Sequence, residues 1–473
     1  MRELPEGWEW TISGDVCSSV RDGTHDTPKY LDNGIPLITS KNLKSGKIDF
    51  STAKLISIND HQQISVRSGV DDGDILFAMI GTIGNPVIVN KEKPFSIKNV
   101  ALFKKNPSIV ESRYLRCWLS SYSLERILEE DKFIKGTTQK FIPLNNLRNL
   151  PIPLPPLNEQ KRIADRLDQL LTRIDKTKAH LDRIPPLLKR FRQSVLAAAT
   201  SGTLTEEWRE EYVIEKLGLN SIAELKLNDD YLFDLPAGWK WVKLTDIANY
   251  KSGVAFKSNE FSNSGTQVIR LGNVYQGKLD LSRDPIFMKV VPDKVTTLRS
   301  KSIVVSQTGT RHKRDYGYFV MIPEDAPPLL LNQRLLAIMT SPATIAKYVV
   351  LASNTIAYKE FFFSQETGGV NQGNVGIAGV MQGPIPLPPI EEQQEIVRRV
   401  EALFAKADRI EAQYKNARQQ VDRLTPALLA KAFRGELVPQ DPNDEPASVL
   451  LERVKEARSI AQPAKAKRGK KAQ

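Results

Sequence analysis

A short basic turn carries the side chains best suited to binding a nucleic acid. The apolar run SIVVSQ is followed by four consecutive basic or ionisable residues and then by three aromatic ones: Arg311, His312, Lys313, Arg314, Tyr316, Tyr318 and Phe319. Arginine can form two hydrogen bonds with guanine in the major groove, and lysine and histidine can bind phosphates. The pattern favours a DNA contact at a hairpin tip, with a solvated charged hairpin as the alternative.

Polar loop residues near the start of the chain form a second group of candidates. The loop VRDGTHDTPKY and the residues after it offer Arg21, His25, Lys29, Tyr30, Lys41, Asn42 and Lys44 as DNA contacts. A later loop, YKSGVAFKSN, contributes Lys251 and Lys257. Polar groups on loops of a rigid scaffold suit recognition. Asp, Thr and Asn also simply make turns, so both interpretations stay open.

Two glycine-containing segments carry a glutamine at their fourth position. They are GTTQK at 136–140, with Gln139 and Lys140, and GVNQG at 369–373, with Gln372. A glutamine amide can bind the edge of adenine, or it can hydrogen-bond within its own turn. Asn99, Gln333 and Arg334 are further candidates.

The motifs of common enzymes are missing from the sequence. It has no GxxxxGK[ST] phosphate loop, no HExxH, no paired CxxC and no Asn-Pro-Pro-aromatic motif of amino-methyltransferases. The four histidines are scattered, and IGTIG at 80–84 is better explained as a turn between two strands. We therefore expect no catalytic site, metal or cofactor in this chain, and favour a binding protein over a self-contained enzyme with unrecognised motifs.

Composition agrees with binding to a polyanion. The 473 residues carry a formal net charge of +12, which suits DNA because neutralising phosphates releases counterions. The basic tail after Ile460 is expected to be disordered. No apolar run approaches the roughly 18 residues that a membrane helix needs. The two cysteines fit a reducing, cytoplasmic location.

The chain is an internal duplication with a period of about 233 residues. LPEGWEW (4–10), PIPLPPLNEQ (151–160) and SVLAAATSGTL (194–204) return as LPAGWKW (235–241), PIPLPPIEEQ (384–393) and ALLAKAFRGEL (427–437). The first part of each copy contains short apolar runs broken by Gly, Asn and Pro, among them IPLITS, VALFK and SIVVSQTG, which predict a mixed α/β domain. PIPLPP is expected to stop any strand or helix and mark a boundary.

The second part of each copy is predicted to be a helix with a heptad pattern. Its apolar positions alternate four and three residues apart in both copies. They are Ile163, Leu167, Leu170, Ile174, Thr177, Leu181, Ile184, Leu188, Phe191 and Val195, and then Ile396, Val400, Leu403, Ala407, Ile410, Tyr414, Ala417, Val421, Leu424 and Leu428. Pro185, Pro186 and Pro426 should kink or interrupt these helices.

These two apolar stripes can be buried in two ways. Each helix can pack on its own globular domain, or the helices can pack on each other. We favour pairing, because matched stripes otherwise need two separate partners. The long connection between the helices makes an antiparallel pair natural. A purely structural coiled-coil scaffold without a DNA role is less attractive, given the basic turn.

Taken together, these features resemble a known protein family. Duplicated globular domains, each followed by P-x-P-L-P-P-L/I-x-E-Q and a long helix, resemble type I restriction–modification specificity subunits. The phrases DGTHDTPKY, GTTQKFIPLNNLRNLPIPLPPLNEQ and LLAKAFRGELVPQDPNDEPASVLLERV strengthen the resemblance over nearly the whole chain. It implies an α/β (α+β) fold with two target-recognition domains at 1–156 and 234–389. Helical spacers at 157–233 and 390–460 would form an antiparallel coiled coil, followed by the basic tail 461–473.

The resemblance also implies a division of labour. Each domain would recognise one half of a bipartite, asymmetric site in double-stranded DNA, and the paired helices would fix the gap. Two modification subunits would carry S-adenosylmethionine and methylate adenine N6. Restriction subunits, with ATP and Mg, would complete the nuclease. No catalysis would reside in this chain.

Overall fold

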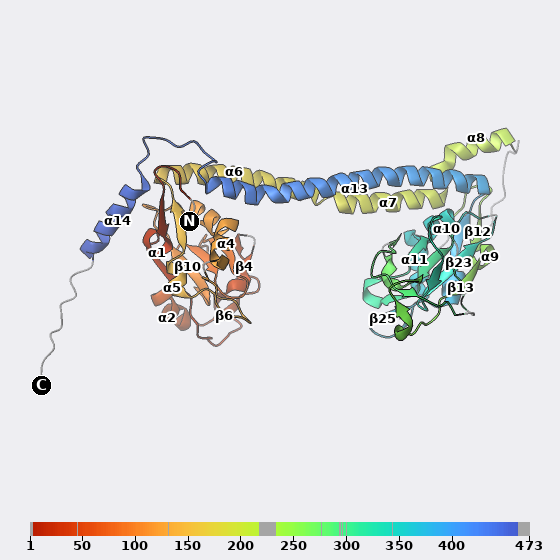
Figure 1. Ribbon diagram of the computed structural model, residues 1–473, viewed down its shortest axis with the longest axis horizontal. Helices are drawn as coiled ribbons and strands as arrows, with labels where there is room; N and C mark the ends of the chain where they lie inside the picture. Colours follow the sequence, from red (N-terminus) through yellow and green to blue (C-terminus); the bar gives the residue numbers. More distant parts are fainter. Residues whose placement is uncertain are drawn as a thin grey trace. The chain divides into compact units, whose positions relative to one another are not determined.

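The computed structural model contains two compact units (Figure 1). One, the terminal unit, combines Met1–Leu181 with Asn416–Gln473, and the other, the central unit, spans Asp182–Lys415. The structure describes residues 3–44, 46–130, 132–216, 233–275, 277–292, 295, 297–298, 300–342 and 344–461. The predicted disordered tail falls almost wholly outside these residues.

The terminal unit is built on a four-stranded antiparallel sheet. Its strands follow the order β2 (Ser19–Asp22), β10 (Val100–Lys104), β7 (Ile75–Ala78) and β8 (Gly84–Ile88). All four residues of β7 (Ile75–Ala78) are buried, because this strand lies inside the sheet and is covered on both faces. A second sheet has the order β6 (Lys54–Ile56), β3 (Ile35–Ile38) and β9 (Ser96–Ile97), and β3 and β9 pair in parallel. Helix α3 (Ser112–Leu119) packs against β8 and buries Trp118.

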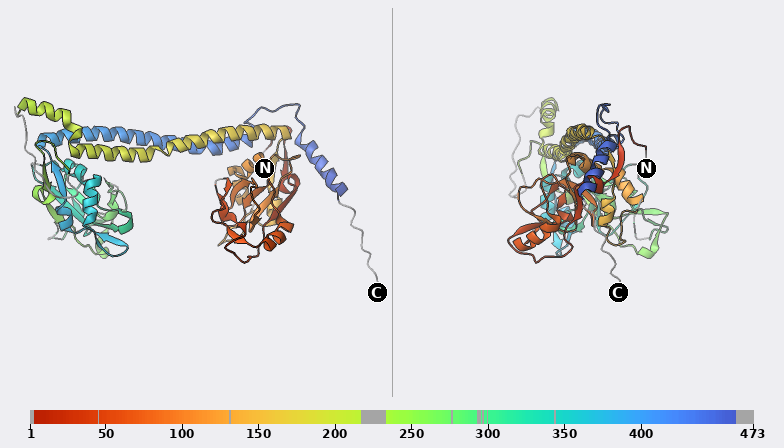
Figure 2. Two further views of the ribbon diagram at one scale, coloured as in Figure 1. Left: turned by 180° about the vertical axis from the view of Figure 1, so that it is seen from behind. Right: turned by 90° about the vertical axis from the view of Figure 1, so that its left-hand side faces the viewer.

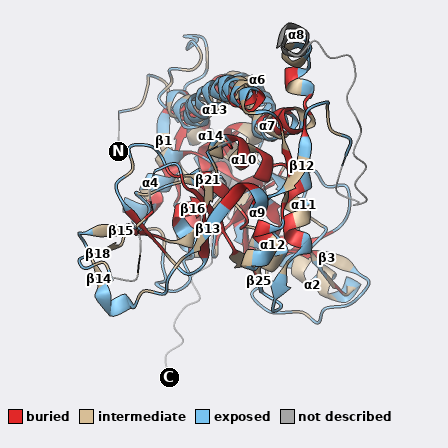
Figure 3. Cartoon of the chain, turned by 90° about the vertical axis from the view of Figure 1, so that its right-hand side faces the viewer, coloured by how far each residue is buried: buried red, intermediate tan, exposed pale blue. Residues whose placement is uncertain are grey.

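The central unit repeats this arrangement with different side chains. Its main sheet has the order β13 (Ala248–Ser252), β23 (Leu335–Thr340), β19 (Ile303–Ser306) and β21 (Phe319–Met321). Its second sheet pairs β15 (Thr266–Ile269) with β22 (Leu329–Leu331) in parallel. Buried residues concentrate in the strands and in helices such as α10 (Ala346–Ser353), as Figure 3 shows. The predicted α/β fold class and the duplication are therefore confirmed.

The remaining elements are short. In the terminal unit they are β1 (Glu9–Ile12), α1 (Ser13–Val16), β2 (Ser19–Asp22), η1 (Ser40–Asn42), β4 (Leu43–Lys44), β5 (Lys47–Ile48), β6 (Lys54–Ile56), α2 (Ile58–Ser68), β8 (Gly84–Ile88), β10 (Val100–Lys104), α4 (Tyr122–Glu130), α5 (Leu144–Arg148), β11 (Pro151–Leu154) and α14 (Ala447–Ala461). In the central unit they are η2 (Thr203–Thr205), α8 (Glu206–Lys216), β12 (Lys240–Lys243), α9 (Leu244–Ile247), β13 (Ala248–Ser252), η3 (Ser258–Glu260), β14 (Phe261–Ser262), η4 (Leu271–Asn273), β16 (Val274–Tyr275), β17 (Lys278–Leu279), β18 (Phe287–Met288), β19 (Ile303–Ser306), β20 (Thr308–Thr310), η5 (Arg311–Lys313), β21 (Phe319–Met321), β23 (Leu335–Thr340), α11 (Ile356–Ser364), β24 (Thr367–Gly368), β25 (Gln372–Asn374), α12 (Ile377–Met381) and β26 (Pro384–Leu387).

The proline-rich stretches do not end the strands, and that prediction was wrong. Residues 151–154 form β11 on β1, and 384–387 form β26 on β12, each in a two-stranded antiparallel sheet. Proline lacks an N–H but is tolerated in a strand that pairs on one side only. The alternating Ile152 and Leu154 are fully buried and supply the apolar face.

Three long helices follow the globular domains: α6 (Leu157–Leu181), α7 (Ile184–Ser201) and α13 (Ile390–Ala432). The break between α6 and α7 falls just before Pro185 and Pro186, as predicted, whereas α13 continues through Pro426. Helix α6 lies alongside the last part of α13 within the terminal unit (Figures 1 and 2), and Lys178 pairs with Asp422 at 3.1 Å.

Helix α7 contacts the first part of α13 within the central unit. Arg192 forms an ion pair with Asp408 at 2.7 Å, and the Leu204 carbonyl accepts a hydrogen bond from Arg399 at 2.8 Å. Higher residue numbers on the α7 side therefore meet lower numbers on α13, so this pair is antiparallel. The contact between the long helices is confirmed.

The apolar stripe is buried mainly near the globular domains. Ile163, Leu167, Ile174, Leu188, Val195, Ile396, Val400 and Ala407 are buried, whereas Leu170, Leu181, Ile184, Leu403, Tyr414, Ala417, Val421 and Leu428 are half-buried. Ile163 and Leu167 share a core with Leu429 of α13 and with the adjacent domain. Both modes of burial that the sequence left open therefore occur together.

Three predicted positions of the stripe are not buried. Ile410 is 47% exposed, Leu424 45% and Phe191 39%, so their placement in a closed interface was wrong. Thr177 is also exposed and hydrogen-bonds the Arg173 carbonyl. A two-helix pair covers only part of each helix surface, so some positions of the stripe stay exposed.

A tryptophan–glutamate contact occurs where each domain meets its helix. Trp8 donates a hydrogen bond to Glu159 at 3.1 Å, and Trp239 donates one to Glu392 at 2.8 Å. Glu392 also pairs with Arg209 at 2.9 Å. Oε1 of Glu159 is buried and has no hydrogen-bond partner, and burial raises the pKa of this carboxyl above its ordinary value. The two copies thus differ in how the buried charge is compensated.

Across the helices that the structure describes, none is long and apolar enough to cross a membrane.

Candidate nucleic-acid interface

The basic turn lies between β19 and β21, as the sequence predicted. Its two arginines are held by acidic side chains of the same unit. Arg311 pairs with Glu366 at 3.0 Å and donates to the carbonyls of Gly368 and Gly369. Arg314 pairs with Glu360 at 3.1 Å and lies 4.9 Å above the ring of Phe363. Both arginines therefore fix the turn in place.

The other two residues of the turn are His312 and Lys313. Both are exposed, and neither side chain has an ion-pair partner among the residues that the structure describes. Tyr316 behind them is buried, and its hydroxyl hydrogen-bonds Glu366. The turn therefore presents these two side chains on a rigid base, a suitable arrangement for contacting a phosphate.

The two glutamine segments form equivalent hairpins. In the terminal unit, Lys135 and Phe141 exchange backbone hydrogen bonds of 2.8 and 2.9 Å, which leaves 136–140 as the loop. In the central unit, β24 and β25 enclose the corresponding loop. Gln139 and Gln372 are exposed, and no partner for either side-chain amide is found in the described parts of the chain. Lys140 is exposed beside the first of them.

The loop after β2 is organised around a buried carboxylate. Asp22 pairs with Arg67 of α2 and with His25 at 2.9 Å, and His25 also contacts Asn99 at 2.8 Å. Lys29 and Tyr30 lie further along this loop and are exposed. Arg67 could not be predicted as a partner of this loop, because it lies far from the loop in the chain.

Asn42 has a structural role, and its assignment as a DNA contact was wrong. Its side chain is 3% exposed, accepts from the backbone N–H of Thr39 at 2.9 Å and donates to the Asp49 carbonyl at 3.0 Å. Asn273 makes the matching contacts in the central unit. Each asparagine uses its amide to close a turn. Neighbouring Lys41 is exposed, and Lys44 pairs with Asp49 at 3.0 Å.

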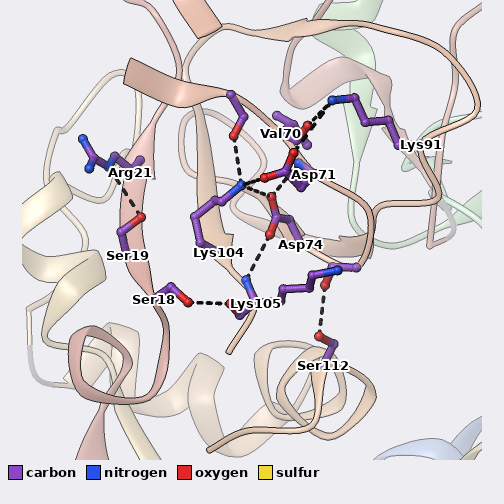
Figure 4. A network of polar contacts seen from close by, with 12 residues as sticks. Ser18, Ser19, Arg21, Val70, Asp71, Asp74, Lys91, Lys104, Lys105 and Ser112 are labelled. Atoms are coloured by element: carbon purple, nitrogen blue, oxygen red, sulfur yellow. Dashed lines mark hydrogen bonds and ion pairs between the residues drawn. The ribbon is translucent and has the colours of Figure 1, made fainter. Parts of the chain in front are cut away.

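Arg21 lies on β2 beside a network of charged residues (Figure 4). Lys104 contacts Asp71 and the fully buried Asp74, and its hydrogen bond lowers the pKa of Asp71. Arg21 is exposed and has only a long contact of 3.5 Å with Ser19. In the central unit Lys251 is half-buried on β13, whereas Lys257, Gln333 and Arg334 are exposed.

The described residues contain no group of three or more His, Cys, Asp or Glu that could hold a metal ion. Cys17 and Cys117 are buried free thiols, and burial raises the pKa of Cys117 to about 11. A thiol with so high a pKa is a poor nucleophile at neutral pH.

Comparison with known proteins gives a consistent result. A family model described as type I restriction modification DNA specificity domain matches residues 5–185 and 236–418. The type I restriction enzyme EcoKI specificity subunit of Escherichia coli (strain K12) is 31% identical and covers 99% of both chains. The StySPI specificity subunit of Salmonella potsdam is 30% identical, also over 99% of both.

Two solved structures share the fold. The crystal structure of the HsdS subunit from Thermoanaerobacter tengcongensis matches with a TM-score of 0.55 and 20% identity, over 92% of this chain and 98% of that one. A chain from a study of complex assembly in the type I R-M system matches with a TM-score of 0.66 and 19% identity, over 92% and 100%. The chain belongs to the family of type I restriction–modification DNA specificity subunits, a non-catalytic family whose members confer DNA specificity.

Proposed function

We propose that each globular domain recognises one half of a bipartite, asymmetric DNA site. The supporting observation is that both domains have the same backbone arrangement at one edge of the sheet, whereas the turns there carry different side chains. In each unit the glutamine hairpin pairs with the residues that follow an inner strand of the main sheet. The pairing residue is Ile80, after β7, in the terminal unit and Thr308, after β19, in the central unit. The turn at 82–85 is uncharged, whereas that at 310–315 is strongly basic. Different side chains on one frame suit two different half-sites. The domain bounds proposed for recognition are 1–156 and 234–389.

The proposed DNA contacts are exposed side chains near these turns and loops. They are Arg21, His25, Lys29, Tyr30, Lys41, Gln139 and Lys140 in the terminal unit, and Lys251, Lys257, His312, Lys313 and Gln372 in the central unit. We assign Arg311 and Arg314 mainly to positioning, because both have acidic partners within the domain. Any base contact by either arginine requires that its ion pair opens.

We propose that the helical segments 157–233 and 390–460 set the gap between the half-sites and bind two modification subunits. Phe191 and Ile410 are exposed apolar side chains on these helices, and exposed apolar groups favour protein contacts. S-adenosylmethionine, ATP and Mg would be bound by the modification and restriction subunits. The buried free thiols fit a cytoplasmic complex.

Selection from a library of random double-stranded DNA tests the proposal. The full chain is incubated with the library at low and moderate salt, and the bound DNA is sequenced. We expect two short half-sites of different sequence at a fixed separation, with binding that weakens as salt rises. A continuous motif, or no motif at either salt concentration, would refute recognition by two separate domains.

A further inference from the structure

The two glutamine hairpins share a backbone feature that local sequence pattern does not reveal. Gly136 has a φ of +88°, and a Cβ there would lie 2.3 Å from the Gln139 carbonyl oxygen. Gly368 has a φ of +115°, and a Cβ there would lie 2.3 Å from the Gln372 carbonyl oxygen. Each hairpin therefore needs glycine at this point, and each holds its glutamine at the same place in the turn.

The hairpins are also held against the same part of each sheet. In the terminal unit the Gly81 N–H donates to the Lys140 carbonyl at 2.8 Å. In the central unit Gly309 pairs with Gly373, the residue after Gln372. Each glutamine hairpin is thus fixed beside a turn, 82–85 in one domain and 310–315 in the other, and the sequences of these two turns differ.

Nothing in the fold itself explains why this residue is glutamine in both copies. The side chains are exposed and make no hydrogen bond within the described residues, and the rest of the loops differs. The terminal loop has Thr137 and Thr138, whereas the central loop is one residue longer and has Gly, Val and Asn at 369–371. The glycine is retained for its backbone, so the glutamine must be explained by what it binds.

We propose that Gln139 and Gln372 recognise a base pair common to both half-sites, and that this pair is A·T. This inference rests on the proposed recognition of DNA by both domains. A glutamine amide carries a donor and an acceptor side by side, which matches N7 and N6 of adenine in the major groove. Lys140 lies in the hairpin of the terminal unit, and Lys313 lies in the turn beside the hairpin of the central unit. Both would supply positive charge for the flanking phosphates. The divergent turns at 82–85 and 310–315 would recognise the bases that differ.

Binding measurements on duplexes carrying the selected site test this assignment. The wild-type consensus should contain an A·T pair at the equivalent position of both half-sites. Gln139→Ala and Gln372→Ala should each weaken binding by about tenfold or more. Each should relax the preference at that one position, in one half-site for the first variant and in the other for the second. Thr138→Ala, a neighbouring exposed substitution, should change affinity by less than about twofold.

The outcomes separate this assignment from the broader proposal. If the wild-type chain selects no bipartite site, recognition by two domains fails. If it does, but the half-sites share no A·T pair or both glutamine variants keep full affinity and preference, only the shared contact is refuted. A variant whose melting temperature falls and whose affinity drops equally for all sequences would show that glutamine supports the hairpin and not a base.

Discussion

Lengthening both paired helices at opposed positions should lengthen the gap in the DNA site. The ion pair between Lys178 and Asp422 identifies such positions within the terminal unit. Because the pairing is antiparallel, residues after Lys178 face residues before Asp422. We therefore duplicate Thr172–Lys178 immediately after Lys178, and duplicate Lys415–Val421 immediately before Asp422. Whole heptads preserve the phase of the apolar stripe and leave this ion pair intact.

The expected size of the shift follows from helix geometry. Seven residues at about 1.5 Å each add roughly 10 Å. At about 3.4 Å per base pair this corresponds to roughly three base pairs. The recognition domains would also turn around the duplex, since B-DNA repeats about every 10.5 base pairs. We expect a gap longer by two or three base pairs, lower affinity and unchanged half-sites.

Library selection with the double-insertion variant measures this shift. The control carries only the insertion in α6, which leaves the helices unequal and should lower the melting temperature. An insertion between Ala407 and Tyr414 of α13 would not match the insertion in α6, because that segment of α13 pairs with α7. If the double insertion selects the original gap with full affinity, the helices do not set the spacing and serve only to bind partner subunits.

Two further predictions concern the basic turn and the buried carboxylates. Lys313→Ala and His312→Ala should weaken binding to all sequences alike and, for the lysine, reduce the salt slope by about one; an altered consensus would show a base contact. Glu392→Gln should destabilise the folded chain by about 3 kcal/mol, because it leaves the half-buried Arg209 without its counter-charge, whereas Glu159→Gln should cost less than about 1 kcal/mol. Burial raises the pKa of Glu159, so its stabilising contribution is present below the ordinary pKa and disappears as the pH rises through the raised value. Glu159→Gln should remove that dependence in denaturant unfolding measured across pH; equal losses for both variants would contradict the reasoning.

Much of the architecture could be predicted because it depends on local pattern. Repeated phrases showed the duplication, and buried runs such as VALFK (100–104) became the expected strands. The helices were visible from their apolar spacing, and their interruption from Pro185 and Pro186. PIPL was misjudged, because a proline strand paired on one side depends on the strand it meets, which lies more than 130 residues away.

The site was less predictable, because the role of a polar side chain depends on its neighbours in space. Arg311 looked equivalent to Lys313 in sequence, yet only the arginine meets a carboxylate, from a residue 55 positions later. Asn42 looked like a loop contact but is buried and closes a turn. Which cations are free is set by tertiary packing, and a one-dimensional pattern does not contain that information.

Scrambling each part of the selected site tests most directly whether two domains recognise two separated half-sites. Four duplexes are compared by competition binding to the full chain: the consensus, and versions with the first half-site, the second half-site or the gap scrambled at constant length. Each mismatched base pair in a half-site should cost about 1–3 kcal/mol, so scrambling either half-site should abolish specific binding. Scrambling the gap should leave affinity within about twofold. Full affinity with only one half-site intact, or a loss on scrambling the gap as large as that for a half-site, would contradict the account.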